Sequence, residues 1–407
     1  MWRAKFIKNS ILSEKKYIAK SKNAFSLFWK GLAFSSFLFL HLPTYAEREM
    51  VDSNAKKEVS EKRLAEQKEV KALFGYSLND VSDKILTISC NGPDGRSSGS
   101  GFVATLDGKT YLFTNQHVIL GSDTISFKTA DGETLRPRKV ELSTSRDIVR
   151  LLLSDDARGF EVTKKMAIGT PIAIFGNSEG GGVATELYGE ITAVAADVVE
   201  VSADFVAGNS GSPVLNTNKE VIGISTFVRF YSDDEEGAKT RRFCYRLSGN
   251  KWVPVNWKKY NEKYGKLYRE KEAFVGSILE IVNNWYESPF GRVLVDEDID
   301  SDLRKWAVAH NHMINRINRL RDKGRCSQHE LNNTNKQISK DMQDSATALS
   351  AVCRKRARQM HILAKQRGFS NFLKKGFEAF AKRLDLAAWE IDRYGKQLAE
   401  IKFFHFE

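Results

Sequence analysis

The chain has 407 residues, of which 42% are hydrophobic and 28% are charged. This composition excludes a disordered chain, and the length exceeds what one ordinary core organises, so two or more domains are expected. The formal net charge of +12 is uneven, because residues 251–407 hold 30 Lys and Arg against 20 Asp and Glu, whereas residues 47–250 hold 25 against 30. The basic excess belongs to the two ends, which predicts a domain boundary near residue 250. No nucleic-acid partner is expected.

The first 46 residues have the pattern of an export signal. Eight Lys and Arg precede an apolar run from Gly31 to Leu42, and Thr44 and Ala46 supply small residues for a cut after Ala46. Twelve apolar residues are too few to span a bilayer of about 30 Å. The alternative is an uncleaved anchor through residues 24–42, which would associate the chain with a membrane. Both interpretations place the rest of the chain outside the cytoplasm, in the periplasm or the extracellular space.

Residues 47–75 are rich in Lys, Glu and Ala, which predicts a solvated helix or charged linker with no assigned function. From about Lys84, short β-type runs alternate with turn signals. The runs are Ile85–Cys90, Ser100–Thr105, Tyr111–Thr114, Thr124–Lys128, Val140–Ser143, Ile148–Leu153, Pro171–Phe175, Glu190–Val194, Val198–Val201, Ser212–Leu215, Val221–Thr226 and Arg242–Arg246. This pattern predicts an all-β sandwich or a pair of barrels over residues 76–250 and argues against an α/β-hydrolase.

Residues 251–407 have helical periodicity instead. Apolar residues recur at steps of three and four, as in Phe274, Ile278 and Ile281, which predicts a mostly α-helical domain of unassigned role. Breaks are expected around Pro289–Gly291 and Gly368–Ser370.

Two further patterns occur in this helical region. A basic face comprises Arg354, Lys355, Arg356, Arg358, Lys365, Arg367, Lys374 and Lys375. Such a run is typical of a solvated helix face, and the alternatives are a contact with the acidic middle region or with an anionic polymer, nucleic acid or membrane surface. His310 and His312, with His329 and Glu330, could ligate a metal. Their two-residue spacing places His310 and His312 on different helix faces, so structural histidines are favoured and neither a metal nor a cofactor is expected.

Four cysteines follow the predicted signal, and no two of them have the spacing of a zinc or redox site. Export permits disulfides, and the domain split favours Cys90 with Cys244 and Cys326 with Cys353. Four buried free thiols are the equal alternative.

Three short motifs, in the order His, Asp, Ser, carry the chemistry of the middle region. His117 follows the apolar run Tyr111–Phe113 and is the only histidine between Ala46 and His310, so imidazole base catalysis there must use it. Ser210 lies between glycines in Gly-Asn-Ser-Gly-Ser-Pro, a turn that exposes the hydroxyl. The amides of Gly208 and Ser210 can then converge on an oxyanion, an interaction worth about 3 kcal/mol per donor.

Asp147 completes a predicted triad but is the weakest member. It heads the apolar strand Ile148–Leu153, where burial could hold it against an imidazole. Nearby competitors are Asp123, Asp131 and Asp155.

Residues 84–246 resemble the trypsin-like, chymotrypsin-fold serine proteases, and most closely their bacterial HtrA/DegP-like branch. The motifs that carry the resemblance are Ser98–Val103, Thr114–Val118, Asp147–Val149 and Gly208–Pro213 followed by Val221–Ile224. The resemblance implies two six-stranded β-barrels with the site in the cleft between them. It also implies that His117 is the general base, Asp147 its orienter and Ser210 the nucleophile.

The resulting hypothesis is an exported serine endopeptidase that acts on polypeptides through an acyl-enzyme. The alternative is a protease-like scaffold, catalytically vestigial, whose helical domain binds a partner; the oligomeric state is not predicted. Two features depart from the family. Asn209 replaces the aspartate with which trypsin pairs a newly cut N-terminus, so activation by that cut is not expected. The helical pattern after residue 255 does not fit the PDZ domain usual in the HtrA branch.

The substrate pocket is assigned to Asp204 and Ser225. Asp204 stands six residues before Ser210, the offset at which trypsin carries the aspartate of its basic-residue pocket. This offset gives the hypothesis of cleavage after Arg or Lys. The favoured alternative is a structural contact of Asp204 near the pocket.

Overall fold

The computed structural model describes residues 64–92, 95–233, 237–294, 300–323 and 327–400. The chain divides into two compact units, considered separately below. Within the described residues, the β unit comprises 64–269 together with Phe369–Phe372, and the helical unit comprises 270–368 and 373–400. The predicted signal and anchor lie outside the described residues. None of the described helices is long and apolar enough to cross a membrane.

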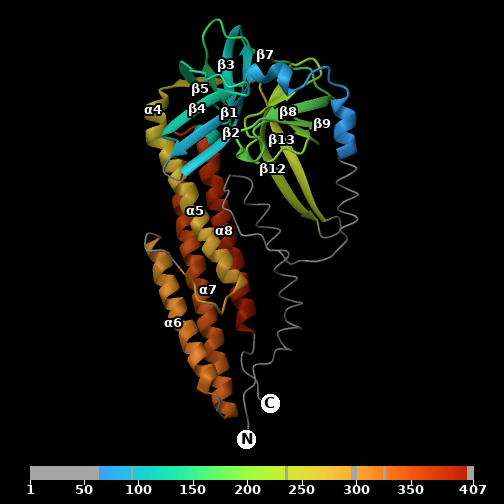
Figure 1. The fold of residues 1–407 in the computed structure, drawn as a ribbon. Coiled ribbons are helices and arrows are strands. Elements are labelled where there is room, and N and C mark those ends of the chain that lie inside the picture. Colours follow the sequence, from blue (N-terminus) through green and yellow to red (C-terminus); the bar gives the residue numbers. More distant parts are fainter. Residues whose placement is uncertain (1–63, 93–94, 234–236, 295–299, 324–326, 401–407) are drawn as a thin grey trace. The chain divides into compact units, whose positions relative to one another are not determined.

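The first half of the β unit is an eight-stranded sheet (Figure 1). Its strands are β1 (Ile85–Gly92), β2 (Gly95–Leu106), β3 (Lys109–Thr114), β4 (Thr124–Thr129), β5 (Lys139–Ser143), β6 (Val149–Leu152), β7 (Phe160–Glu161) and β14 (Trp252–Val255). They follow the order β14-β5-β6-β3-β2-β1-β4, and β7 pairs in parallel with β2. Because β14 pairs with β5, the β unit continues past the boundary predicted near residue 250.

The second half of the β unit is a closed six-stranded barrel. Its strands are β8 (Pro171–Gly176), β9 (Thr185–Val194), β10 (Val198–Val201), β11 (Pro213–Leu215), β12 (Val221–Asp233) and β13 (Gly237–Arg246). This half agrees with the expected barrel. The first half differs, because its pairing path has seven strands, with β7 beside it, and does not close within the described residues. Strand β14 pairs with the edge of β5, and its Trp252 packs edge-on against Phe113, with 6.1 Å between the ring centroids.

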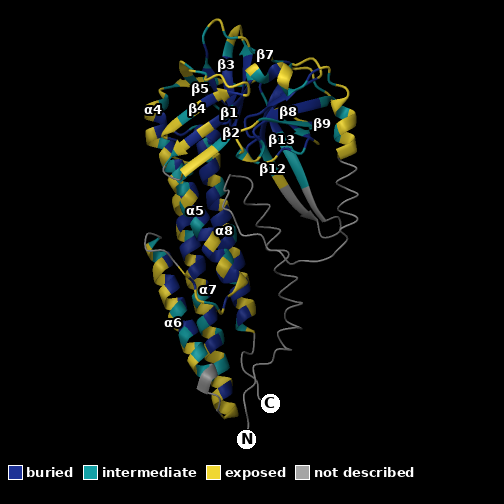
Figure 2. Ribbon diagram, in the orientation of Figure 1, coloured by how far each residue is buried: buried dark blue, intermediate teal, exposed yellow. Residues whose placement is uncertain are grey.

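Strand β8 is buried along almost its whole length (Figure 2), and its side chains alternate between two cores. Ile172 and Ile174 lie inside the barrel with Val214. Phe175 belongs to a second core, which it shares with Phe113 of the first sheet. This shared core fixes the two halves of the β unit against each other, and therefore fixes the loops that both halves contribute to a site.

Four long helices supply the helical unit: α5 (Lys266–Glu287), α6 (Ser301–Lys323), α7 (Gln328–Ala364) and α8 (Asn371–Ala399). The first turns of α5 and α8 belong to the β unit. The breaks fall where they were predicted: α5 ends before Pro289, and α7 ends before Gly368. Ser327 caps α7: its side chain accepts a hydrogen bond from the Glu330 amide, and its own amide donates one to the Glu330 carboxylate at 2.7 Å. The predicted helical region is therefore confirmed.

The favoured disulfide between Cys90 and Cys244 is wrong. Cys90 lies on β1 of the first sheet, where its thiol donates to the carbonyl of Val118 at 3.2 Å. Cys244 lies inside the second barrel and is fully buried. Both are free thiols, as is Cys353 of α7, whose pKa is raised to about 12 by burial. Cys326 lies outside the described residues.

Candidate active site

His117 lies on the short helix α3 (Gln116–Ile119), which follows directly after β3. The two residues before it have fully buried side-chain amides. Asn115 Nδ2 donates to the carbonyl of Asp147 at 2.7 Å, and Gln116 Nε2 donates to the carbonyl of Arg146 at 3.0 Å. These two amides tie the backbone before and at Asp147 to the histidine segment. The sequence motif contains both residues, but their positioning role becomes visible only in three dimensions.

The Asp147 carboxylate contacts His117 through both of its oxygens. Oδ2 is hydrogen-bonded to the imidazole Nδ1, and Oδ1 accepts from the His117 amide at 3.1 Å. Both residues are buried. Two of the competing aspartates bond elsewhere: Asp123 pairs with Lys266, and Asp131 accepts from Thr129. The carboxylate on Nδ1 favours the imidazole tautomer that leaves Nε2 as the basic nitrogen.

The turn that carries Ser210 requires glycine on both sides of Asn209–Ser210. Gly208 and Gly211 have φ angles of +84° and +91°, in the region that favours glycine. A Cβ atom on Gly208 would stand 2.0 Å from the carbonyl oxygen of Asn177, and one on Gly211 would stand 2.0 Å from that of Ser100. Side chains cannot occupy these positions, which explains the Gly-Asn-Ser-Gly pattern.

Strand β2 holds the Ser210 turn and the histidine segment together. The Ser100 amide donates to the carbonyl of Ser210 at 2.8 Å, and its hydroxyl donates to the carbonyl of Gly208 at 2.7 Å. A Cβ on Gly99 would lie 2.7 Å from Val118 and 3.4 Å from the Ser210 carbonyl oxygen. Gly99 therefore lies close to both the residue after His117 and the Ser210 turn. Within the described residues, the amides of Gly208 and Ser210 donate to no protein acceptor.

The region that carries these residues is similar to known proteins. Residues 99–224 match the model of the trypsin-like peptidase domain family. The chain contains a trypsin-like peptidase domain. It is 30% identical over 219 residues to the serine protease Do-like HtrA of Lactobacillus helveticus, covering 49% of this chain and 51% of that protein. It is 32% identical over 146 residues to a probable periplasmic serine endoprotease DegP-like of Rhizobium meliloti, covering 33% and 28%.

A solved structure, the serine endoprotease from Yersinia pestis, is similar over 42% of this chain and 61% of that one, with 22% identity and a TM-score of 0.33. The chain spans about half or less of the length of these curated relatives. By the family match and the curated relatives, the domain is of the HtrA-like, trypsin-like class.

Asp204 of the peptidase domain forms an ion pair. Its Oδ1 lies 2.9 Å from Nη1 of Arg242, and Arg242 Nε donates to the carbonyl of Phe205 at 2.9 Å. This is the structural contact considered as the alternative to a basic-residue pocket. Ser225 is fully buried, and its hydroxyl donates to the carbonyl of Asn209 at 2.5 Å. Ser225 therefore braces the Ser210 turn. The Asp204 carboxylate is paired with Arg242 and is not presented to a substrate as a free anion.

We expect peptide substrates varied at the residue before the scissile bond to show no preference for Arg or Lys over Ala or Val. The Asp204 carboxylate is already neutralised by Arg242, and recruiting it would leave that guanidinium without its counterion. Comparison of kcat/KM across the panel tests this expectation. A strong preference for Arg that disappears in Asp204→Asn would contradict it.

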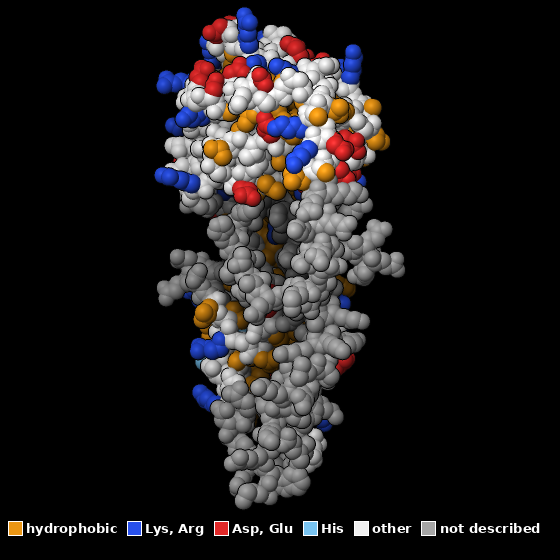
Figure 3. All heavy atoms as spheres, turned by 45° about the vertical axis from the view of Figure 1, so that its right-hand side comes forward, with side chains coloured by type: hydrophobic (Ala, Val, Ile, Leu, Met, Phe, Trp, Pro, Cys, Tyr) orange, Lys and Arg blue, Asp and Glu red, His pale blue; other side chains and the backbone are white. Residues whose placement is uncertain are grey.

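Charged side chains on the face of the peptidase domain seen in Figure 3 alternate in sign and form no single basic patch. The predicted basic face of the helical unit is likewise neutralised at its centre. Lys355 and Arg356 of α7 both contact Asp302, at 2.6 and 2.7 Å, and Arg354 pairs with Asp392. These pairs favour the expected solvated helix face over an anion-binding surface.

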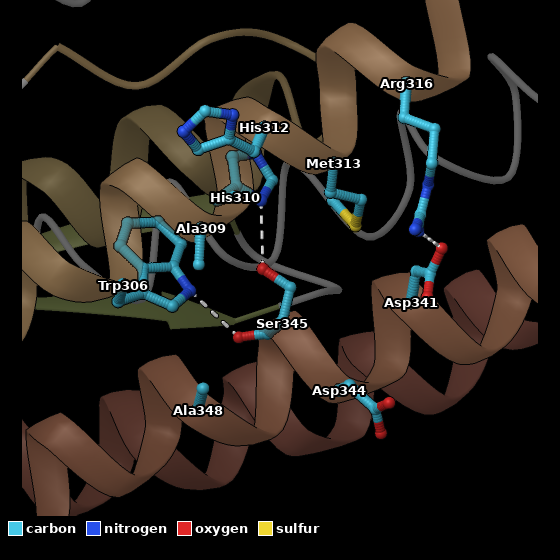
Figure 4. A pocket seen from close by; sticks show the side chains of 10 residues that line it. All are labelled: Trp306, Ala309, His310, His312, Met313, Arg316, Asp341, Asp344, Ser345 and Ala348. Atoms are coloured by element: carbon cyan, nitrogen blue, oxygen red, sulfur yellow. Dashed lines mark hydrogen bonds and ion pairs between the residues drawn. The ribbon is translucent and has the colours of Figure 1, made fainter.

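A cavity of about 620 Å³ between α6 and α7 contains His310 and His312 (Figure 4). Both His310 nitrogens are occupied, by the Ser345 hydroxyl at 2.9 Å and the Gly291 carbonyl at 3.2 Å. Burial lowers the His310 pKa. Among the described residues, no cluster of three His, Cys, Asp or Glu side chains could hold a metal ion. The two hydrogen bonds of His310 fit the structural role that the sequence favoured for it.

Proposed function

We propose that this chain is an exported serine endopeptidase that cleaves polypeptides through an acyl-enzyme at Ser210. The observation that carries the proposal is the two-oxygen contact of Asp147 with His117, beside a glycine-built turn that bears Ser210. The trypsin-like peptidase match supports the reaction class. Export is supported by the pattern of the first 46 residues and by the periplasmic name of the Rhizobium meliloti relative.

Acylation begins when Ser210 Oγ attacks the carbonyl carbon of the scissile peptide. His117 Nε2 takes the hydroxyl proton as the new C–O bond forms, and the carbonyl electron pair moves to oxygen. Asp147 holds the ring through Nδ1 and stabilises the imidazolium. The amides of Gly208 and Ser210 donate to the oxyanion, each contributing about 3 kcal/mol.

Collapse of this intermediate breaks the C–N bond. His117 returns its proton to the departing amine, which leaves as the first product. A water molecule then attacks the ester of Ser210 while His117 accepts one of its protons. The second collapse restores the Ser210 hydroxyl and releases the carboxylic acid, so the enzyme is regenerated without a redox step.

The site is proposed to form without proteolytic activation. Asn209 is fully buried, its Oδ1 accepts from the Val206 amide at 3.0 Å, and its Nδ2 donates to the Ser178 hydroxyl at 3.1 Å. Both ends of the Asn209 amide are therefore hydrogen-bonded to neighbouring loop residues. A neutral Asn209 has no need for the cation of a new N-terminus.

Hydrolysis of an unfolded protein tests the proposal. The purified full chain is expected to cleave β-casein at neutral pH with no added cofactor, releasing peptides that accumulate with time. Mass spectrometry of the products identifies internal cleavage sites. A folded, monodisperse chain that releases no peptides would instead support the protease-like scaffold.

A further inference from the structure

Two side chains beyond the matched residues 99–224 hold the loop that begins at His117. This histidine loop, His117–Ser122, receives one clamp from Asn261 and another from Arg269. Asn261 lies at the start of the π-helical turn Asn261–Gly265, and Arg269 lies in the first turn of α5. Both belong to the β unit, and Arg269 is its last residue before the chain enters the helical unit.

Asn261 bonds the end of the loop with both halves of its amide. Its Oδ1 accepts from the Gly121 amide at 2.6 Å, and its Nδ2 donates to the carbonyl of Ser122 at 2.8 Å. The side chain is buried, so neither bond is replaced readily by water. Asn261 therefore fixes the point where the loop rejoins the sheet.

Arg269 bonds the start and the middle of the loop. Its Nη2 donates to the carbonyl of His117 itself, and its Nε donates to the carbonyl of Leu120 at 2.9 Å. Helix α3 has only four residues, and its last carbonyls need partners from outside the helix. The guanidinium supplies donors in a rigid fork, which fixes the two carbonyls relative to each other.

Two glycines make this close approach feasible. Gly121 has a φ of +80°, and a Cβ there would stand 2.3 Å from Arg269 Cγ. A Cβ on Gly265 would stand 2.3 Å from Asn261 Oδ1 and 2.8 Å from the Gly121 nitrogen. The backbones of the loop and of the π-helical turn therefore pack directly against each other, although the two segments are distant in the sequence.

We infer that Asn261 and Arg269 are positioning residues for His117, an inference that rests on the proposed function of His117 as the general base. Asp147 holds the imidazole, while the clamp holds the backbone from which the imidazole extends. A displacement of about 1 Å at a reacting group can cost about 100-fold in rate. The segment of the β unit that carries Asn261 and Arg269 therefore contributes directly to the geometry of the peptidase site.

Substitution in the full chain tests the clamp through two readouts. We expect Asn261→Ala and Arg269→Ala to lower kcat by about 10- to 100-fold with little change in KM, at a temperature where circular dichroism shows full folding. Arg269→Lys should restore only part of the loss, because an ammonium cannot fork between two carbonyls. Lys266→Ala is the matched control, since its exposed pair with Asp123 lies outside the histidine loop.

The second readout does not depend on catalysis. The His117 Nδ1 proton bonded to Asp147 should give a downfield resonance in chain labelled with ¹⁵N-histidine. We expect this resonance in the parent and in Lys266→Ala, and its loss or broadening in both clamp variants. If the resonance depends on the clamp but the parent cleaves nothing, the clamp stands and the proposed function fails. Parent-like kcat and resonance in both folded clamp variants would overturn the clamp.

Discussion

Replacement of Ser210 by alanine is expected to lower kcat on β-casein by about a million-fold, the scale expected when the nucleophile of a catalytic triad is lost. The Ser210 hydroxyl oxygen is the atom that would form the acyl-enzyme. The fold should persist, because the turn is held through backbone carbonyls of Gly208 and Ser210 by Ser100. We therefore expect a melting temperature close to that of the parent chain.

Ser212→Ala is the matched control for this substitution. Ser212 lies two residues further along the same turn, and within the described residues its buried hydroxyl has no hydrogen-bond partner. Its removal leaves no donor or acceptor unpaired, so hydrolysis should continue at a rate close to that of the parent. Loss of activity in Ser212→Ala with activity retained in Ser210→Ala would reverse the assignment of the nucleophile.

Asp147→Asn should reduce kcat by about 10⁴-fold while KM changes little. The substitution conserves shape, but it removes the charge that stabilises the imidazolium and replaces one acceptor oxygen by a donor. The ring would then favour the tautomer in which Nε2 carries the proton and cannot accept one from Ser210. Steady-state kinetics on a peptide ester, together with β-casein, measure the effect.

Asp155→Asn provides the comparison, since Asp155 was a sequence candidate and is exposed. Its variant should behave like the parent. An Asp147→Asn chain that retained most of its kcat would show that His117 is oriented by another group. That result would remove Asp147 from the mechanism while leaving the roles of His117 and Ser210 open to separate tests.

Local signals in the sequence predicted much of this architecture. Gly208 and Gly211 are required by their positive φ angles and by backbone oxygens close to where a Cβ would stand. The turn can therefore be recognised from a short stretch of sequence. The helix breaks at Pro289 and Gly368 are local in the same sense. Because His117 is the only histidine between Ala46 and His310, the sequence also identified the candidate general base. Such features depend on residues that are adjacent in the sequence, so a single sequence is enough to predict them.

Features that depend on long-range pairing were not predicted. Strand β14 pairs with β5 more than a hundred residues earlier, which moved the domain boundary beyond residue 250. Cys90 and Cys244 lie in different halves of the β unit, a separation that spacing along the chain does not encode. The pairing of Asp204 with Arg242 and the clamp of Arg269 on the histidine loop also join residues far apart in the sequence, so local patterns did not predict them.

The most direct test of the central claim is covalent labelling by a fluorophosphonate, followed by peptide mapping. An activated serine attacks phosphorus and displaces fluoride, so the label reports nucleophile and base together without requiring the natural substrate. We predict one labelled residue, Ser210, with labelling abolished in Ser210→Ala, strongly slowed in Asp147→Asn and retained in Ser212→Ala. A correctly folded chain that takes no label, or takes it at another residue, would contradict the assignment of Ser210 as the activated nucleophile.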